Sequence, residues 1–372
     1  MAILAFAGSL TRPAPNYANA AGEGITSFAF DPVTGAFAKL ALFPGIDDCT
    51  WLVIHPRCPC LYALCDVAGT DQSWVVALRF DARGVLSEIN RQPTGGQTAC
   101  HASLTPDGRF LLVANYNAEV PAGAPEAAVC VLPVGADGSL APASDKVVHT
   151  GRGPDAQRQT RSHAHCALAS PDGQFVYVAD LGTDRLLVYR LDSDGRLAVQ
   201  AASGLDMPPG SGPRHIALSP DRRHLFVISE LQPKVFSLCV AAEGGALDLA
   251  DTLTIADTGR RSQPSGLIHD EEASCLYAGL RGSDEIMRID VDRQTGRLDA
   301  GPRWPSGGAT PRDLAFTPGG QFLVVANQDA DRLTTFRTGL EPPGSPRHTA
   351  IKTPMAVAFA AAGPQHLDGE HR

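Results

Sequence analysis

The sequence predicts an all-β protein, namely a seven-bladed β-propeller with four-stranded antiparallel blades around a central channel. Three observations support this prediction: a repeated unit along most of the chain, a high content of turn-forming residues, and complementary strands at the two ends. A ring of small sheets suits such repeats, because closure of the ring leaves no long sheet edge exposed.

The repeat is an apolar strand, a turn that is often Pro-Asp-Gly, and a second apolar strand. The second strand starts at six positions, which are Leu61, Phe110, Phe175, Leu225, Leu276 and Phe322. Another β-like run and often a further turn follow each copy. This unit of about four strands in roughly 50 residues matches the size of a propeller blade.

The ends of the chain supply the remaining strands. We expect strands around Ile3 to Ala7 and Ile25 to Asp31, and a lone strand around Ala356 to Ala360. Joining the lone strand to the N-terminal strands would complete a seventh blade and cover both sheet edges. The propeller is thus expected to span residues 1–361 as a single domain, with residues 362–372 as a polar C-terminal tail.

One interval between repeats is longer than the others. Residues 120–159, between Phe110 and Phe175, are rich in Gly, Pro and Ala. We expect them to form a surface loop inserted in the third blade, and not a linker between two domains.

Composition and charge disfavour several classes of partner. The 372 residues carry a formal charge of −9, which would repel nucleic acids and anionic membranes. No apolar run is long enough to span a membrane, and Ala2 to Leu10 is interpreted as a first strand because it lacks the basic start of a signal peptide. The nine cysteines form no Cys-x-x-Cys pair, so we expect reduced thiols in a cytoplasmic protein, present as a monomer or small homo-oligomer.

Polar residues recur where the repeats should approach the channel. His163 and His165 stand at the start of one strand, two residues apart and therefore on one face. In the other repeats, polar residues stand directly before or within the start of a first strand, or after a second strand; they are His101, Tyr116, Arg214, His215, Glu230, Arg281, Arg312 and Gln328. Side chains at such positions are expected to lie outside the apolar core between the blades.

These residue types indicate acid–base chemistry on an anion. Arginines around a narrow channel would repel one another unless a carboxylate or phosphate group lay between them. A histidine and a glutamate nearby can accept and donate protons. A single histidine or arginine is more often structural, so the interpretation depends on the convergence of several repeats. No Gly-x-Ser-x-Gly motif, dinucleotide-binding loop or metal-ligand spacing occurs, so we expect no serine nucleophile, no cofactor and no dedicated metal site.

Four segments resemble a known family. They are HASLTPDGRFLLVANYNAEV, SHAHCALASPDGQFVYVADLGTDRLLVY, GPRHIALSPDRRHLFVISEL and PRDLAFTPGGQFLVVANQDADRLTTF. In sequence and in order they are similar to segments of the propeller-type lactonases, which include 6-phosphogluconolactonases and 3-carboxy-cis,cis-muconate lactonizing enzymes. The resemblance extends over nearly the whole chain and implies the seven-bladed fold.

The resemblance also implies a catalytic set. The family's Ser-His-x-His histidine corresponds to His165, its Gly-Pro-Arg-His arginine to Arg214, the glutamate after the following strand to Glu230, and the arginine of its Asn-Arg-Gly segment to Arg281. We expect His165 to act as the base and Glu230 to orient it or the water, although the two roles could be exchanged. The other polar residues are expected to bind substrate; they are His101, Tyr116, His163, His215, Arg312 and Gln328.

The chain departs from the family's pattern at three points. Ala164 stands where the family commonly has proline, and Leu280 replaces the asparagine before the arginine of the fifth repeat. Residues 265–268 read Ser-Gly-Leu-Ile where the family often has Ala-Glu-Ile-His. Two polar channel residues are thereby missing, which affects the identity of the substrate more than the type of reaction.

The expected function is hydrolysis of an anionic, sugar-derived lactone, in the manner of a 6-phosphogluconolactonase. Metal-independent acid–base catalysis would open the ring while arginine anchors the acid group of this small substrate. A muconate-type cycloisomerase would use the same residues and remains an alternative. A non-catalytic propeller that binds a protein is disfavoured, since the chain has three Trp residues and no Trp-Asp dipeptide.

Overall fold

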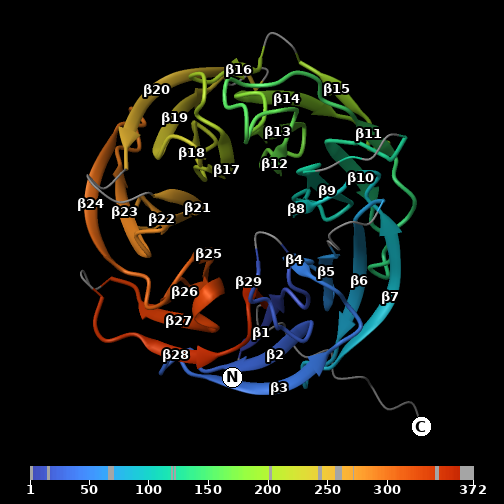
Figure 1. Cartoon of the computed structure of the whole chain (residues 1–372), viewed down its shortest axis with the longest axis vertical. Coiled ribbons are helices and arrows are strands. Elements are labelled where there is room, and N and C mark those ends of the chain that lie inside the picture. Colours follow the sequence, from blue (N-terminus) through green and yellow to red (C-terminus); the bar gives the residue numbers. More distant parts are fainter. Residues whose placement is uncertain are drawn as a thin grey trace.

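A computed structural model shows a closed ring of seven antiparallel sheets (Figure 1). It describes residues 3–14, 17–65, 71–118, 120, 123–200, 203–241, 245–255, 262–270, 272–339 and 343–360. The predicted all-β, seven-bladed propeller is therefore confirmed. The helix found in these ranges is a single turn of 3₁₀-helix, η1 (Gln328–Ala330), and no helix there is long and apolar enough to cross a membrane.

Strands follow one another from the channel to the rim in every blade except the first, which takes its inner strand from the C-terminus. Blade 1 contains β29 (Pro354–Ala360), β1 (Ile3–Ser9), β2 (Ile25–Phe30) and β3 (Phe37–Phe43). Blade 2 contains β4 (Cys49–Ile54), β5 (Cys60–Cys65), β6 (Trp74–Phe80) and β7 (Leu86–Pro93). Blade 3 contains β8 (Ala99–Leu104), β9 (Phe110–Asn115), β10 (Val129–Pro133) and β11 (Asp145–Val147).

The remaining blades continue in chain order around the ring. Blade 4 contains β12 (Ala164–Ala169), β13 (Phe175–Asp180), β14 (Arg185–Leu191) and β15 (Leu197–Val199), and the short β16 (Leu205–Asp206) also pairs with β14. Blade 5 contains β17 (Pro213–Leu218), β18 (His224–Ser229), β19 (Lys234–Val240) and β20 (Leu247–Thr254). Blade 6 contains β21 (Gln263–Asp270), β22 (Cys275–Arg281), β23 (Glu285–Val291) and β24 (Leu298–Pro305). Blade 7 contains β25 (Pro311–Phe316), β26 (Phe322–Asn327), β27 (Arg332–Arg337) and β28 (Arg347–Ala350).

The core lies between neighbouring blades. The second strands β9 and β26 are buried along their whole length, because other blades cover both of their faces. Between blades 3 and 4, for example, Phe110 and Leu112 of β9 pack in one cluster with Val176 and Val178 of β13. The fourth strands lie on the rim (Figure 1) and are largely exposed, as in β20. Each first strand is therefore left beside the channel.

The C-terminal strand closes the ring. β29 pairs antiparallel with β1, with Val357 opposite Ala7 and Phe359 opposite Ala5. Figure 1 shows the red β29 beside the blue β1. The strands expected at both ends of the sequence thus join in one sheet, blade 1, and complete the ring of seven as predicted. The expected tail at residues 362–372 lies outside the described residues.

The prediction of a surface loop at residues 120–159 is wrong in part. β10 and β11 lie inside this range and form the two outer strands of blade 3. Residues 129–132 are fully buried and pair with β9, so the Gly- and Pro-rich sequence around them concealed a core strand. The irregular chain after β11 contributes Arg158 to the site described next.

Candidate active site

Inner strands share an irregularity near their start. Pairing with the neighbouring strand skips one residue, which is Thr50 in β4, Cys100 in β8, His165 in β12, Arg214 in β17, Arg312 in β25 and Met355 in β29. In β21 it skips two, Ser265 and Gly266. Bulges of this kind re-aim a side chain and are common beside active sites. Five of the skipped residues line one small cavity, so the bulges gather side chains from several blades at one mouth of the channel.

Three of these bulges are preceded by a backbone N–H that an aspartate holds. Each aspartate stands directly before the third strand of the preceding blade. Each accepts a hydrogen bond from a backbone N–H of the next blade; the pairs are Gly212–Asp184, Thr310–Asp284 and Thr353–Asp331, at 2.8, 2.8 and 2.9 Å. Each donor residue has a left-handed φ between 43° and 63° and stands two positions before a bulge. These hydrogen bonds therefore help to place Arg214 and Arg312.

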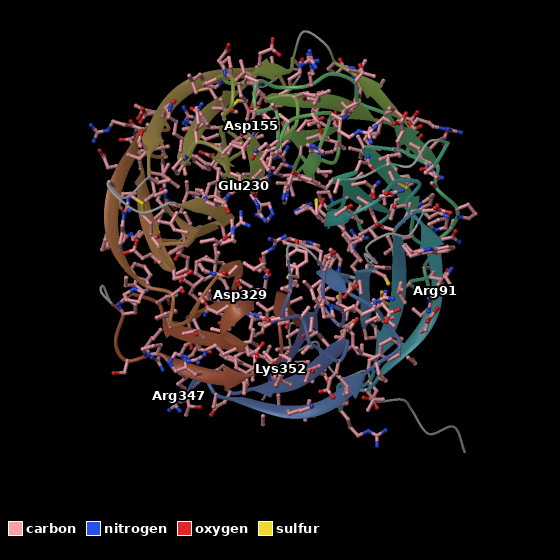
Figure 2. All side chains as sticks on the ribbon, viewed as in Figure 1. Arg91, Asp155, Glu230, Asp329, Arg347 and Lys352 are labelled. Carbon is pink, nitrogen blue, oxygen red and sulfur yellow. The ribbon has the colours of Figure 1, made fainter. Side chains whose placement is uncertain are left out.

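Glu230 lies at the centre of the polar cluster, directly after β18. Its Oε2 accepts hydrogen bonds from Nε of Arg214 at 2.9 Å and from Nη2 of Arg281 at 2.8 Å. Its Oε1 accepts a hydrogen bond from Nη2 of Arg158 at 2.5 Å. Figure 2 shows Glu230 near the centre of the ring. One carboxylate thus joins arginines from three separate parts of the chain.

Two of these arginines are also bound to backbone carbonyl groups. Arg214, which is only 2% exposed, donates to the carbonyl of Ser265. Arg281 donates to the carbonyls of Gln263 and Pro264 at 3.0 and 3.1 Å. Such contacts leave both guanidinium groups little freedom to move.

The charge state of Glu230 follows from its partners. Burial alone would raise the pKa of this carboxyl group, yet Arg281, Arg214 and Arg158 hold the pKa well below its ordinary value of 4.5. Glu230 is therefore an ionised anchor for the arginines and a poor proton donor or acceptor at neutral pH.

Arg158 was not identified from the sequence. It lies in the irregular segment between β11 and β12, where Oδ1 of Asp155 accepts backbone N–H groups of Gln157 and Arg158 at 2.9 and 3.0 Å. This tight turn presents the arginine to Glu230 and to the Tyr116 hydroxyl, 3.3 Å away. The alternation of residues along strands could not predict Arg158, because this residue lies in a turn outside the strands.

Arg312 has no carboxylate partner among the described residues. Its Nη2 lies 3.4 Å from the hydroxyl of Tyr17, and its guanidinium group lies 5.8 Å from the centre of the same ring. With Arg214, Cys100 and His215, it lines a cavity of about 30 Å³. An anion entering this mouth would meet a cation that forms no direct ion pair with an acidic side chain of the described residues.

Next to the arginines lies a belt of four rings. The ring centre of His215 is 5.5 Å from that of His165, 5.6 Å from His101 and 5.4 Å from Trp51. Burial and the nearby Arg214 lower the pKa of His165 and of His215 well below 6.5, and that of His101 to about 3. All three imidazoles are consequently neutral at neutral pH and able to accept a proton or a hydrogen bond.

His165 and His163 have different surroundings, although they stand only two positions apart. Cys100 Sγ lies 3.8 Å from Nδ1 of His165, whose ring also meets Tyr116 edge-on at 5.7 Å. The ring of His163 stacks on Tyr116 at 4.3 Å, and its Nδ1 donates to the Tyr116 carbonyl at 2.7 Å. His163 therefore positions Tyr116, whereas His165 lies in the belt.

The structure brings together nine of the ten predicted site residues, which are His101, Tyr116, His163, His165, Arg214, His215, Glu230, Arg281 and Arg312. Gln328 lies in η1 and donates to Asp329 at 2.8 Å, and no contact within the described ranges joins it to the cluster. Besides Arg158, the sequence analysis missed Tyr17 and Cys100. No group of three or more His, Cys, Asp or Glu in the described chain could hold a metal ion.

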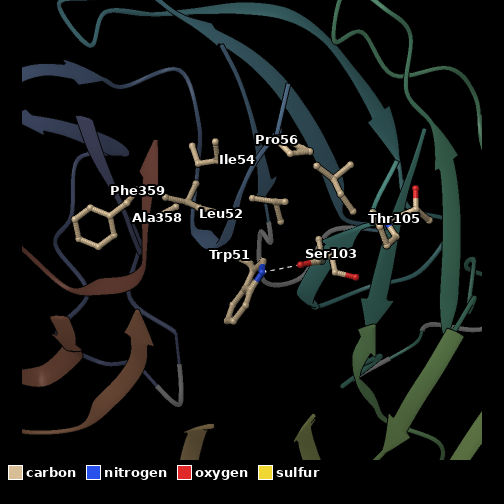
Figure 3. A pocket seen from close by; sticks show the side chains of 12 residues that line it. Trp51, Leu52, Ile54, Pro56, Ser103, Thr105, Ala358 and Phe359 are labelled. Carbon is tan, nitrogen blue, oxygen red and sulfur yellow. Dashed lines mark hydrogen bonds between the residues drawn. The ribbon is translucent and has the colours of Figure 1, made fainter. Parts of the chain in front are cut away.

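A second, mainly apolar hollow lies toward the other ends of three inner strands. A hollow of about 470 Å³ is lined by the far ends of β4 and β8 and by Ala358 and Phe359 of β29. Figure 3 shows Trp51 at its inner side, where the indole N–H donates to the Ala102 carbonyl at 2.9 Å. Trp51 also lines the small polar cavity, so it borders both spaces.

Comparison with known proteins agrees with this geometry. The family model described as "Lactonase, 7-bladed beta-propeller" matches residues 5–358. A 6-phosphogluconolactonase of Bacillus subtilis is 30% identical over 92% of this chain and 94% of its own length. The structure of a periplasmic gluconolactonase of Pseudomonas aeruginosa matches with a TM-score of 0.86 at 30% identity, over 98% of this chain and 100% of that one. A putative 6-phosphogluconolactonase of Bacteroides fragilis matches with a TM-score of 0.85 at 26% identity, over 97% and 98%. The chain therefore belongs to the seven-bladed propeller family of lactonases.

Proposed function

We propose that this lactonase hydrolyses a sugar-derived lactone that carries an acid group, with a phosphorylated gluconolactone as the preferred substrate. Membership of the family and the names of the relatives support hydrolysis of a cyclic ester. The choice of an anionic substrate rests on the positive charge at the arginine-lined mouth of the channel. Arg158, Arg214 and Arg281 share one ionised carboxylate, Glu230. Arg312 lines the cavity beside Arg214, in a chain whose net charge is −9.

Arg312 is the proposed anchor for the acid group. Three of the four arginines already share Glu230, whereas Arg312 has only the Tyr17 hydroxyl and ring as recorded partners among the described residues. A guanidinium group matches phosphate and carboxylate oxygens with paired donors. Arg214, which lines the same cavity, is the proposed donor to the oxyanion that develops on the carbonyl.

His165 is the proposed base and acid of the reaction. As a neutral imidazole it can remove the proton from water when the water oxygen bonds to the lactone carbonyl carbon. When the bond from that carbon to the ring oxygen breaks, the imidazolium returns the proton to the ring oxygen. The products are the open hydroxy acid and an unchanged His165, and the scheme requires no metal ion.

Glu230 has a different proposed role from the base considered in the sequence analysis. Its depressed pKa makes it a weak base and leaves no proton to donate at neutral pH. It instead holds Arg214, Arg281 and Arg158 against their mutual repulsion. Glu230→Gln is therefore expected to disturb arginine positions, and through them substrate binding as well as turnover.

The test is a comparison of glucono-δ-lactone with its 6-phosphate, for wild type and Arg312→Met. We expect wild type to prefer the phosphorylated lactone in kcat/KM. Arg312→Met should lower kcat/KM at least about tenfold for that substrate, the loss of one charged hydrogen-bonding partner, and change it little for the neutral lactone. The exposed Arg297, paired with Asp299 on the surface, gives the matched control Arg297→Met.

Two outcomes would refute this proposal. Equal losses on both lactones would show that Arg312 does not recognise the acid group. Activity lost on exhaustive EDTA treatment and restored by one divalent metal would replace His165 with a metal-activated water.

A further inference from the structure

In three blades, the residue that follows the bulge bonds to the next inner strand. Trp51, His101 and Asp313 hold this position in β4, β8 and β25. Their partners are the Ala102 carbonyl at 2.9 Å, the Ala167 N–H at 3.4 Å and the Val357 N–H at 3.0 Å. This repeated contact ties the inner strands together around the channel.

His215 holds the same position in β17 and breaks the pattern. It is only 5% exposed, yet its Nε2 has no hydrogen-bond partner in the described part of the chain. The next inner strand, β21, is the one whose bulge contains two residues, Ser265 and Gly266. The extra residue in this bulge shifts the β21 backbone out of the register in which it would face the imidazole of His215.

The unpaired His215 borders the small polar cavity of the arginine mouth. Arg214, Arg312, Tyr17 and Cys100 share the lining, and the volume of about 30 Å³ is close to that of one water molecule. A buried water requires two to four polar partners, and this lining offers guanidinium donors beside an imidazole. Buried nitrogen atoms are rarely left without a partner, so the cavity is suited to a bound water.

We propose that this cavity holds the water molecule that attacks the lactone, and that Nε2 of His215 accepts a hydrogen bond from this water. The inference rests on the proposed function and adds to it the place of the nucleophile. His165, whose ring centre lies 5.5 Å from that of His215, removes the other hydrogen as a proton. The water oxygen then bonds to the carbonyl carbon, the ring C–O bond breaks, and the proton passes from His165 to the ring oxygen.

The protonation state of His215 agrees with this role. Burial, then Arg214 and the neighbouring His165, His101 and Arg312, keep the pKa of His215 well below 6.5. The imidazole is thus neutral, and with the proton on Nδ1 its Nε2 is an acceptor. Glu230 favours the protonated form of His165, so His165 is assigned as the base and His215 as the positioning residue.

The experiment compares His215→Leu and His215→Gln with the matched variant His224→Leu, on the neutral and the phosphorylated gluconolactone. His224 is a buried histidine of the same blade, only 2% exposed. It begins β18, whereas Glu230 follows the end of that strand, and its ring stacks on Phe226 at 6.3 Å. We expect His215→Leu to lower kcat by about 10²-fold on both lactones with KM nearly unchanged. His215→Gln, which retains an acceptor oxygen, should recover part of the rate. His224→Leu should lower the melting temperature but change kcat less than threefold per folded enzyme.

The outcomes separate this inference from the proposed function. An unchanged kcat for folded His215→Leu, or a rise in KM alone, would overturn the water site. If wild type hydrolyses neither lactone, the proposed function fails, and a high-resolution crystal structure decides the water site independently. A water within hydrogen-bond distance of His215 Nε2 in wild type, and lost in His215→Leu, supports the site, while a dry cavity refutes it.

Discussion

At the scale of single residues, the site depends on burial as much as on charge. Burial keeps the imidazoles of His165 and His215 neutral, whereas the arginines around Glu230 outweigh its burial and keep that carboxylate ionised. Lactone opening needs a neutral acceptor for one proton and fixed positive charge for an oxyanion. A neutral histidine beside buried arginines provides both, without a second titrating group.

The lowered pKa of His165 predicts the pH dependence of activity. His165 must be neutral to accept a proton, and burial followed by Arg214 lowers its pKa well below 6.5. We therefore expect kcat/KM to stay constant as pH falls through 6.5 and to decline only at lower pH. Initial rates after subtraction of the spontaneous hydrolysis measure this profile. A decline centred at or above pH 6.5 would exclude His165 as the base, and His165→Ala should lower kcat by about 10²–10⁴-fold.

Asp313 should make stability depend on pH in the opposite sense to a typical carboxylate. Burial raises its pKa from 3.8 to about 7, so the folded protein binds this proton more tightly than the unfolded chain. The contribution of Asp313 to stability is therefore complete below pH 3.8 and is lost as pH rises through about 7. Asp313→Asn, which can still accept the Val357 N–H, should raise the melting temperature at pH 8 and flatten its dependence between pH 5 and 8. The exposed Asp248→Asn serves as the control, and an unchanged slope in Asp313→Asn would contradict the assignment.

At the scale of structural elements, the sequence predicted strands well and the local breaks in strands poorly. Continuous apolar runs after Pro-Asp-Gly turns mark strands such as β9 and β13, because neighbouring blades bury both faces of each. A bulge adds one residue without any compositional signal, so the period of two could not separate Arg214 from His215. The position of Arg158 depends on a turn held by the Asp155 side chain, and the alternation of residues along strands does not predict such a turn. The pattern of residues alone could not rank the polar residues, and the resemblance to lactonases selected the four catalytic candidates among them.

The hydrogen bonds between blades predict a link between stability and activity. Asp284 accepts the Thr310 N–H at 2.8 Å, and Thr310 stands two residues before Arg312 with φ of 59°. Asp284→Ala removes a charge-assisted hydrogen bond, so we expect a loss of about 1.5–3 kcal/mol of unfolding free energy. Denaturant unfolding measures this loss. The kcat/KM for a phosphorylated lactone should fall as well, whereas the exposed Asp248→Ala should leave both quantities unchanged. Equal stability of Asp284→Ala and wild type would show that this contact does not tie the blades together.

At the scale of the whole molecule, the ring sets the site apart from its surroundings. Side chains from blades 3, 5, 6 and 7 and from the segment before blade 4 meet at one mouth, although long stretches of chain separate them. The polar residues stand at the start of inner strands or at the end of second strands, and the interior between blades remains apolar. A change of substrate therefore requires substitutions at a few bulges and not a new fold, which is consistent with relatives named for both phosphorylated and unphosphorylated gluconolactones.

Ring closure by β29 should be essential for folding. This strand covers β1 over the six pairs from Leu4–Ala360 to Ser9–Pro354, and its side chains Met355, Ala356 and Val357 are buried. A chain ending at Thr353 would expose the β1 edge and the apolar flank of blade 7. We expect this truncation to aggregate or to lose cooperative thermal unfolding, measured by calorimetry and size-exclusion chromatography. A chain ending at Ala360, which lacks only the final polar residues of the sequence, should melt within a few degrees of wild type. Cooperative unfolding of the shorter chain at the wild-type temperature would show that the ring closes without the C-terminal strand.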